Sequence, residues 1–262
     1  MNETIKILNK RRSVRAWETT PITEHHLKTI IHATMRAPTA GNQMLYTILQ
    51  VDDQKKKDKL AKTCDNQPWI AKAPLILIFL SDMQRWYDFY ASCGVKELCE
   101  KQNLTYRTPK ESDLMISSCD ALIAAQNAVI AAESLGIGSC YIGDIMENIE
   151  IHREMFNLPK WVFPITMLCF GYPKSKIENP KLTPRFDEKY VYYHDEYKRL
   201  EKEDFDEMFK KKIEAFNNME KKPSGVDNFG QQFYTYKTGA DFSVEMERSV
   251  KKAIKDWNEA KS

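Results

Sequence analysis

The sequence predicts an α+β fold in which helices flank a central sheet. Two observations carry this prediction: residues 75–80 form an unbroken apolar run, and helical patterns precede and follow that run along the chain. An apolar run of strand length is typical of a central strand whose two faces are both buried. With 262 residues and 42% hydrophobic content, the chain can form one large core, or one core with a smaller appendage.

The N-terminal part is predicted to be helical. Thr4 is a suitable cap for a first helix, and Thr23 precedes a second run of apolar residues at helical spacing. Ala-Pro-Thr-Ala-Gly-Asn at residues 37–42 ends the second helix, because proline restricts the residue before it and Gly-Asn tolerates left-handed geometry.

Further strands are expected at residues 45–51, 139–142 and 162–170. A long helix is expected over residues 113–135. Its apolar residues lie most of the way round, so we expect it to be largely buried, with Gly136 after its end.

Beyond residue 179 the chain becomes charged, helical and rich in tyrosine. We therefore expect a core over residues 1–180 and a C-terminal extension over residues 181–262 that wraps a partner subunit. The excursion at about residues 82–112 is expected to interrupt the core.

Charge and cysteine content argue against several classes of protein. The 39 basic and 37 acidic residues nearly cancel, so there is no electrostatic case for nucleic acid or a membrane as the main partner. The six cysteines form no Cys-x-x-Cys pair and the histidines show no ligand spacing, so we expect no metal site. The N-terminus lacks a signal-peptide pattern, and no apolar run approaches the roughly 18 residues of a membrane span. We expect a soluble, cytoplasmic protein.

Residues 11–15 read Arg-Arg-Ser-Val-Arg and are a candidate anion site. In an extended backbone Arg11, Ser13 and Arg15 point to one side and offer two guanidinium groups and a hydroxyl to one phosphate. The alternative is a solvated basic turn. Taken by itself, this segment is more typical of such a turn than of an anion site.

Residues 136–143, Gly-Ile-Gly-Ser-Cys-Tyr-Ile-Gly, superficially suggest a dinucleotide loop. The order is wrong, because these glycines follow a helix and enter a strand, whereas that loop joins a strand to a helix. A helix cap and a turn explain Gly136. They do not explain Gly143, which would let backbone N–H groups approach a flat ligand closely.

Three further segments are weaker candidates. Residues 38–42 combine small residues with an amide, Gln67 precedes the central strand, and two prolines in residues 179–185 present Arg185. The alternatives are a simple turn, an exposed loop and a surface linker.

The combined order of these segments resembles the FMN-dependent nitroreductase family, most closely its oxygen-insensitive, NADPH-preferring nitroreductase and flavin reductase branch. The most specific likeness runs over residues 121–143, followed by Cys-Phe-Gly-Tyr-Pro at 169–173 and Asn-Pro-Lys-Leu-Thr-Pro-Arg at 179–185. The resemblance implies a three-layer α+β sandwich with a central, mainly antiparallel sheet flanked by helices. It also implies a homodimer, formed through long helices and C-terminal arms, with FMN at the interface.

The resemblance further implies a set of FMN-binding residues, with no catalytic side chain because the chemistry takes place on the flavin. They are Arg11, Arg12, Ser13, Arg15, Thr39, Ala40, Asn42, Gln67, Tyr141, Ile142, Gly143 and Arg185. We expect Arg11, Arg12, Ser13 and Arg185 to hold the phosphate and Arg15 to lie near the ring. Position 11 departs from the branch, where histidine is common, and Thr183 stands where lysine is common.

The implied activity is that of an FMN-dependent NAD(P)H oxidoreductase that reduces nitroaromatics, quinones or related small electron-poor acceptors by two-electron, ping-pong hydride transfer. NADPH or NADH is the donor. Two alternatives remain open: a flavin reductase that supplies reduced FMN to another protein, and an FMN-binding sensor or storage protein.

The excursion at residues 82–112 is rich in aromatic residues. They are Trp86, Tyr87, Phe89, Tyr90 and Tyr106. One hypothesis is a partial lid over the flavin of the partner subunit, where the rings would stack on flat acceptors. The alternative is a helical pair whose aromatic rings pack into their own core.

Overall fold

The computed structural model describes residues 2–174 and 182–259. The chain divides into two compact units: one is Met1–Glu178 together with Glu245–Ser262, and the other is Asn179–Val244. Residues 245–262, which the sequence predicts to lie in the C-terminal extension, belong to the same unit as the sheet.

Contacts of the last helix, α10 (Asp241–Asn258), explain this difference. Its residues Ser249, Ala253 and Trp257 recur every four positions and are all buried. The Ser249 hydroxyl accepts a hydrogen bond from the backbone N–H of Ile149 at 3.0 Å and donates one to the carbonyl of Met146 at 2.6 Å. The charged composition of this segment hides a buried face that follows helical spacing.

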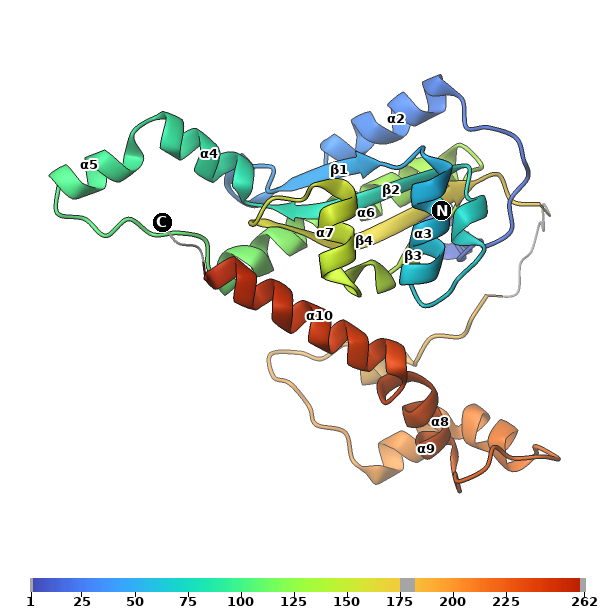
Figure 1. The fold of residues 1–262 in the computed structure, drawn as a ribbon. Helices are drawn as coiled ribbons and strands as arrows, with labels where there is room; N and C mark the ends of the chain where they lie inside the picture. The colour runs from blue at the N-terminus through green and yellow to red at the C-terminus, as the bar shows by residue number, and fades with distance from the viewer. Residues whose placement is uncertain (1, 175–181, 260–262) are drawn as a thin grey trace. The chain divides into compact units, whose positions relative to one another are not determined.

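Four strands form the central sheet (Figure 1): β1 (Tyr46–Gln50), β2 (Leu75–Asp82), β3 (Gly138–Ile142) and β4 (Val162–Gly171). Their order is β1-β2-β4-β3, and every neighbouring pair is antiparallel. The antiparallel α+β fold expected from the resemblance is confirmed.

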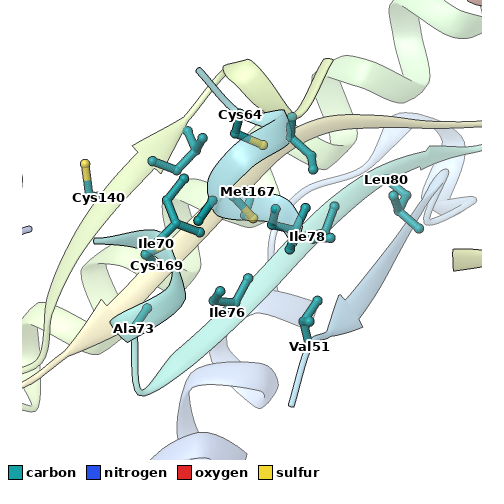
Figure 2. Close-up of a cluster of buried hydrophobic side chains, with 14 of the residues drawn as sticks. Val51, Cys64, Ile70, Ala73, Ile76, Ile78, Leu80, Cys140, Met167 and Cys169 are labelled. Carbon is teal, nitrogen blue, oxygen red and sulfur yellow. The ribbon is translucent and has the colours of Figure 1, made fainter. Parts of the chain in front are cut away.

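Side chains of β2 alternate between two cores. Ile76, Ile78 and Leu80 belong to one cluster, which also contains residues of α3 (Gln54–Thr63) and is drawn in Figure 2. Leu75, Leu77 and Phe79 belong to a second cluster, which contains residues of helices α2 and α6. Helices therefore cover both faces of the sheet, which makes three layers.

The second core is built on α6 (Glu111–Ser134), whose small residues allow close packing. The expectation that this helix is largely buried is only half right. One face of the helix is buried and another is exposed: Ala121, Ala125 and Ala128 are fully buried, whereas Met115, Ile116 and Leu122 are exposed. The helix is also long and apolar enough to cross a membrane by length and composition. Its alanine face is nevertheless buried in the second core.

The remaining α-helices are α1 (Glu3–Lys10), α2 (Glu24–Met35), α4 (Gln84–Ser92), α5 (Val95–Lys101), α7 (Ile149–Phe156), α8 (Lys202–Asn217) and α9 (Phe229–Phe233). Thr23 caps α2 as predicted, since its side chain accepts from the N–H of His26 at 3.2 Å. Thr4 does not cap α1: it lies inside the helix, and Asn2 accepts from the N–H of Ile5 instead. Asparagine is the stronger capping residue.

Candidate functional site

The Arg-Arg-Ser-Val-Arg segment runs along the outer edge of β3. Ser13 forms a parallel bridge with Ser139, and the Val14 N–H donates to the Ser139 carbonyl at 2.9 Å. Val14 points inward and is 5% exposed, and its side chain lies so close to Gly138 that a Cβ there would meet it at 2.6 Å. Ser13 and Arg15, on either side of Val14, are exposed, as the expected alternation requires.

The three arginines of this segment place positive charge beside β3. Among the described residues, none of Arg11, Arg12 and Arg15 has a carboxylate within ion-pair distance. Burial raises the pKa of the Glu133 carboxyl to about 7, although Arg11 and Arg12 act in the opposite direction. Near neutral pH this carboxyl is therefore partly protonated, which preserves the positive potential around the arginines.

Two side chains of β3 respond to the same arginines. Burial raises the pKa of the Tyr141 phenol to about 12, against the opposing charge of Arg11. Burial also raises the pKa of the Cys140 thiol, while Arg15 and Ser13 lower it. The structure therefore brings residues 11–15 together with β3.

The loop that carries Gln67 meets the end of β3 at Asp144. The Gln67 Nε2 group donates to the Asp144 carboxylate at 2.8 Å and to the Cys64 carbonyl at 3.2 Å. Next to this contact, a Cβ added to Gly143 would meet nothing within 4 Å, so the backbone there faces open space. The Arg15 guanidinium lies 5.6 Å from the centre of the Trp69 ring. Three of the five predicted segments thus converge.

The fourth segment, the loop over residues 39–45, folds around Asp120 of α6. The Thr39 hydroxyl donates to Asp120, and the N–H groups of Ala40 and Leu45 donate to the same carboxylate at 3.0 and 3.2 Å. The Thr39 hydroxyl also accepts from the Met44 N–H at 2.8 Å. Asp120 is 2% exposed, so its charge is compensated almost entirely by this loop.

The backbone of this loop is in an unusual conformation. Gly41, Asn42 and Met44 have φ values of 55°, 56° and 51°. Left-handed geometry is easy for glycine, tolerable for asparagine and unfavourable for methionine. The hydrogen bonds to Asp120 hold this strained shape.

Strand order separates this loop from the other three segments. The loop leads into β1 at one edge of the sheet and residues 11–15 lie on β3 at the other edge, which is three strand spacings or about 14 Å away. Tyr46 is level with Phe163 of β4, whereas Ile142 is level with Met167. One chain does not bring Thr39, Ala40 and Asn42 to Gln67 and Gly143.

Arg185, the fifth candidate, lies in the second unit and is exposed. Residues 179–181 of its predicted motif lie outside the described residues. Its side chain forms no ion pair among the described residues.

Most of the aromatic residues in the excursion pack against one another. Tyr87 is 7% exposed, and its ring centre lies 5.1 Å from that of Trp161 and 6.4 Å from that of Tyr106. Trp86 and Tyr90 pack against the same cluster, and only Phe89 of the five is exposed, at 56%. This packing favours the second of the two hypotheses, in which the rings form their own core.

The excursion is nevertheless attached to the Asp120 loop. The Trp86 indole N–H donates to the Gln43 carbonyl at 2.9 Å, and Arg85 donates to the carbonyls of Met44 and Tyr46. Any ligand that contacts residues 39–42 therefore lies near the start of α4.

Sequence reasoning missed Asp120 and Asp144. A signal for the first was present, because Asp120 is the one charged residue in the apolar stretch 114–132. A charge in such a stretch is buried and needs partners. Nothing in the sequence distinguishes Asp144 from a surface acid.

Comparison with known proteins decides the family. Residues 8–172 match the family described as Nitroreductase family. The chain belongs to the nitroreductase family. This confirms the resemblance indicated by the order of the motifs.

Named members of the nitroreductase family align with most of this chain. An FMN reductase [NAD(P)H] of Bacillus subtilis is 34% identical over 70% of this chain and 71% of its own length. An oxygen-insensitive NADPH nitroreductase of Salmonella typhimurium is 30% identical over 77% of each chain. The crystal structure of nitroreductase A from Vibrio parahaemolyticus superposes with a TM-score of 0.78 at 25% identity, covering 97% of this chain and 98% of that one.

Proposed function

We propose that this protein is an FMN-dependent NAD(P)H oxidoreductase that reduces small electron-poor acceptors, such as nitroaromatics and quinones. Membership of the nitroreductase family and relatives that are FMN reductases and NADPH nitroreductases support this function. The observation that carries it is the strip of arginines along β3, which have no carboxylate partner in the part of the chain that the structure describes. This strip ends at the open backbone of Gly143 beside Gln67.

The residues present fit FMN. Arg11, Arg12 and Ser13 offer guanidinium and hydroxyl donors, which are the groups that bind a phosphate dianion. The open space at Gly143 admits a flat ring against the backbone, whereas Gly138 and Gly171 are packed against side chains. A charged strip followed by an open, polar-edged surface matches a ligand with a phosphate at one end and a flat ring at the other.

FMN, when bound, supplies the two-electron hydride chemistry. The protein then needs to hold and orient the ring and to stabilise charge. We assign the phosphate to Arg11, Arg12 and Ser13. Arg15 would supply a cation that stabilises negative charge on the ring, and the backbone at Gly143 would supply N–H donors to it.

We further propose that the site is completed by a second copy of the chain. Thr39, Ala40 and Asn42 lie at the sheet edge opposite residues 11–15, so a site that uses both needs two subunits. The exposed apolar residues of α6, Met115, Ile116, Leu122 and Ile123, recur at helical spacing and suit burial against a partner. In such a homodimer the start of α4, which is hydrogen-bonded to the loop of residues 39–45, would lie near the flavin that this loop helps to bind. We place the protein in the cytoplasm.

A second function, release of reduced FMN to another protein, is favoured by the relatives named FMN reductase. Both functions share the same half-reaction with NAD(P)H. They differ in whether the preferred acceptor is a nitro compound, a quinone or free flavin.

The direct test is the visible absorbance of the purified protein. We expect the bands of bound flavin, and their loss under anaerobic conditions when NADPH or NADH is added. A protein that stays colourless after incubation with FMN would overturn the proposal. Turnover of a nitrofuran, a quinone and free FMN at matched NADPH then separates the two functions, and size-exclusion chromatography tests the homodimer.

A further inference from the structure

Hydrogen bonds fix only one end of the Gln67 side-chain amide, its NH₂ group. Its Nε2 group makes both of its hydrogen bonds to acceptors, the Asp144 carboxylate at 2.8 Å and the Cys64 carbonyl at 3.2 Å. An ionised carboxylate and a carbonyl can only accept hydrogen bonds. The amide must therefore turn its NH₂ group toward them, whichever way its two ends are assigned.

This leaves the other end of the amide for a ligand. The Oε1 atom of Gln67 has no hydrogen-bond partner among the described residues, and the side chain is half-buried beside the open backbone of Gly143. A partly buried carbonyl oxygen without a partner is an acceptor that selects an N–H donor.

Asp144 is itself held in place. Its neighbour Glu147 is 4% exposed, and the Glu147 backbone N–H donates to the Asp144 carbonyl at 3.1 Å. Burial raises the pKa of the Glu147 carboxyl to about 8, reinforced by the charges of Asp144, Asp65 and Glu245. The backbone turn over Asp144–Met146, closed by the bond from the Glu147 N–H, fixes the position from which the Asp144 carboxylate meets Gln67.

We propose that Asp144 is a positioning residue that fixes the Gln67 amide so that its Oε1 accepts a hydrogen bond from the ring N–H of bound FMN. The inference rests on the proposed function and adds a residue and a direction of hydrogen bonding to it. FMN carries a single ring N–H, at N3, between two carbonyl groups. An acceptor at Gln67 therefore recognises that N–H, whereas a donor would recognise a neighbouring carbonyl.

The test compares the dissociation constants of FMN and N3-methyl-FMN, which lacks this N–H, measured by flavin fluorescence. For the wild-type protein we expect FMN to bind about tenfold more tightly than the methylated form, the effect of one hydrogen bond. Asp144→Asn should bring this ratio close to one, because the new amide can donate to Gln67 Oε1 and turn its NH₂ group toward the ligand. Asp144→Ala, which frees the amide, should lower the ratio less.

Asp58→Asn is the matched control. Asp58 on α3 also accepts from a glutamine, Gln54 Nε2 at 2.8 Å, but is exposed, so this variant should keep the wild-type ratio. A merely structural role for Asp144 would weaken both flavins equally and leave the ratio unchanged, which would overturn the inference. An equal affinity of the wild-type protein for the two flavins would also overturn it. If Asp144→Asn does not fold, Asp144→Ala decides. A wild-type protein that binds neither flavin would overturn the proposed function itself.

Discussion

The strip of residues 11–15 along β3 and the loop of residues 39–45 are both proposed to face FMN, yet they are built in opposite ways. The strip carries arginines that have no carboxylate partner among the described residues. The loop has its own anion, Asp120, which accepts three hydrogen bonds from it. The arginines of the strip thus lack a carboxylate partner in the described part of the chain, whereas the donors of the loop are paired with Asp120.

This difference separates affinity from stability. A group whose partner is a ligand contributes to binding, and its removal leaves the empty protein unharmed or relieves charge repulsion. A buried group whose partners belong to the chain contributes to folding first, and to binding only through the shape that it preserves.

The largest expected effect is on the loop. Asp120→Asn should lower the free energy of unfolding by about 4 kcal/mol, because an amide cannot accept on both sides and leaves buried N–H groups without partners. Urea denaturation of the FMN-free protein measures it. The exposed Asp58→Asn should cost less than about 0.5 kcal/mol. A loss for Asp120→Asn as small as that of the control would show that the loop does not depend on its acid.

A pH-dependent effect is expected at Glu147, next to Asp144. Its folded pKa, about 8, lies above the unfolded value of 4.5, so the folded state binds the extra proton between these values and loses stability as pH rises through them. Relative to Glu147→Gln, the wild-type protein should lose about 3 kcal/mol between pH 5 and pH 8.

Glu150→Gln is the control for this prediction. Hydrogen bonds from Arg248 lower the pKa of the Glu150 carboxyl to about 2, so its contribution to stability is lost only as pH falls below 4.5. The difference in unfolding free energy between Glu150→Gln and the wild-type protein should not change between pH 5 and pH 8. The same slope in both variants would mean that Glu147 is not the group that titrates.

Within the strip itself, Arg12→Ala should weaken FMN binding by about 2 kcal/mol, or roughly 30-fold, which is the value of a charge-assisted hydrogen bond. The stability of the FMN-free protein should stay unchanged. Lys28→Ala, which removes an exposed cation on α2, should alter neither quantity. A loss of stability without a loss of FMN affinity would show that Arg12 contributes to folding, as the Asp120 loop does, rather than to FMN binding.

The smallest expected effect concerns Arg15. Arg15→Gln should change FMN affinity by less than about twofold but slow flavin reduction by NADPH about fivefold, or roughly 1 kcal/mol, if this cation stabilises the reduced ring. Stopped-flow absorbance measures the rate. The opposite pattern would assign Arg15 to the phosphate.

Much of the fold could be predicted because its signals are local. The apolar run of β2 and the helical spacing after Thr23 each depend on residues that are close in the sequence. The face of α6 that stays exposed could not be predicted, since apolar residues on both sides of a helix look alike until the sheet covers one of them. The packing of α10 in the unit that contains the sheet could not be predicted either, because its three buried residues are outnumbered by charged ones.

The order of short motifs by itself was enough to predict the family, and with it the α+β fold and the flavin chemistry. Tertiary structure alone decided which motifs meet. Gln67 and Asp144 are 77 positions apart, and Ala40 and Asp120 are 80 apart. Contacts at such distances depend on strand order and register. The same physical cause places residues 39–45 at one edge of the sheet and the arginine strip at the other.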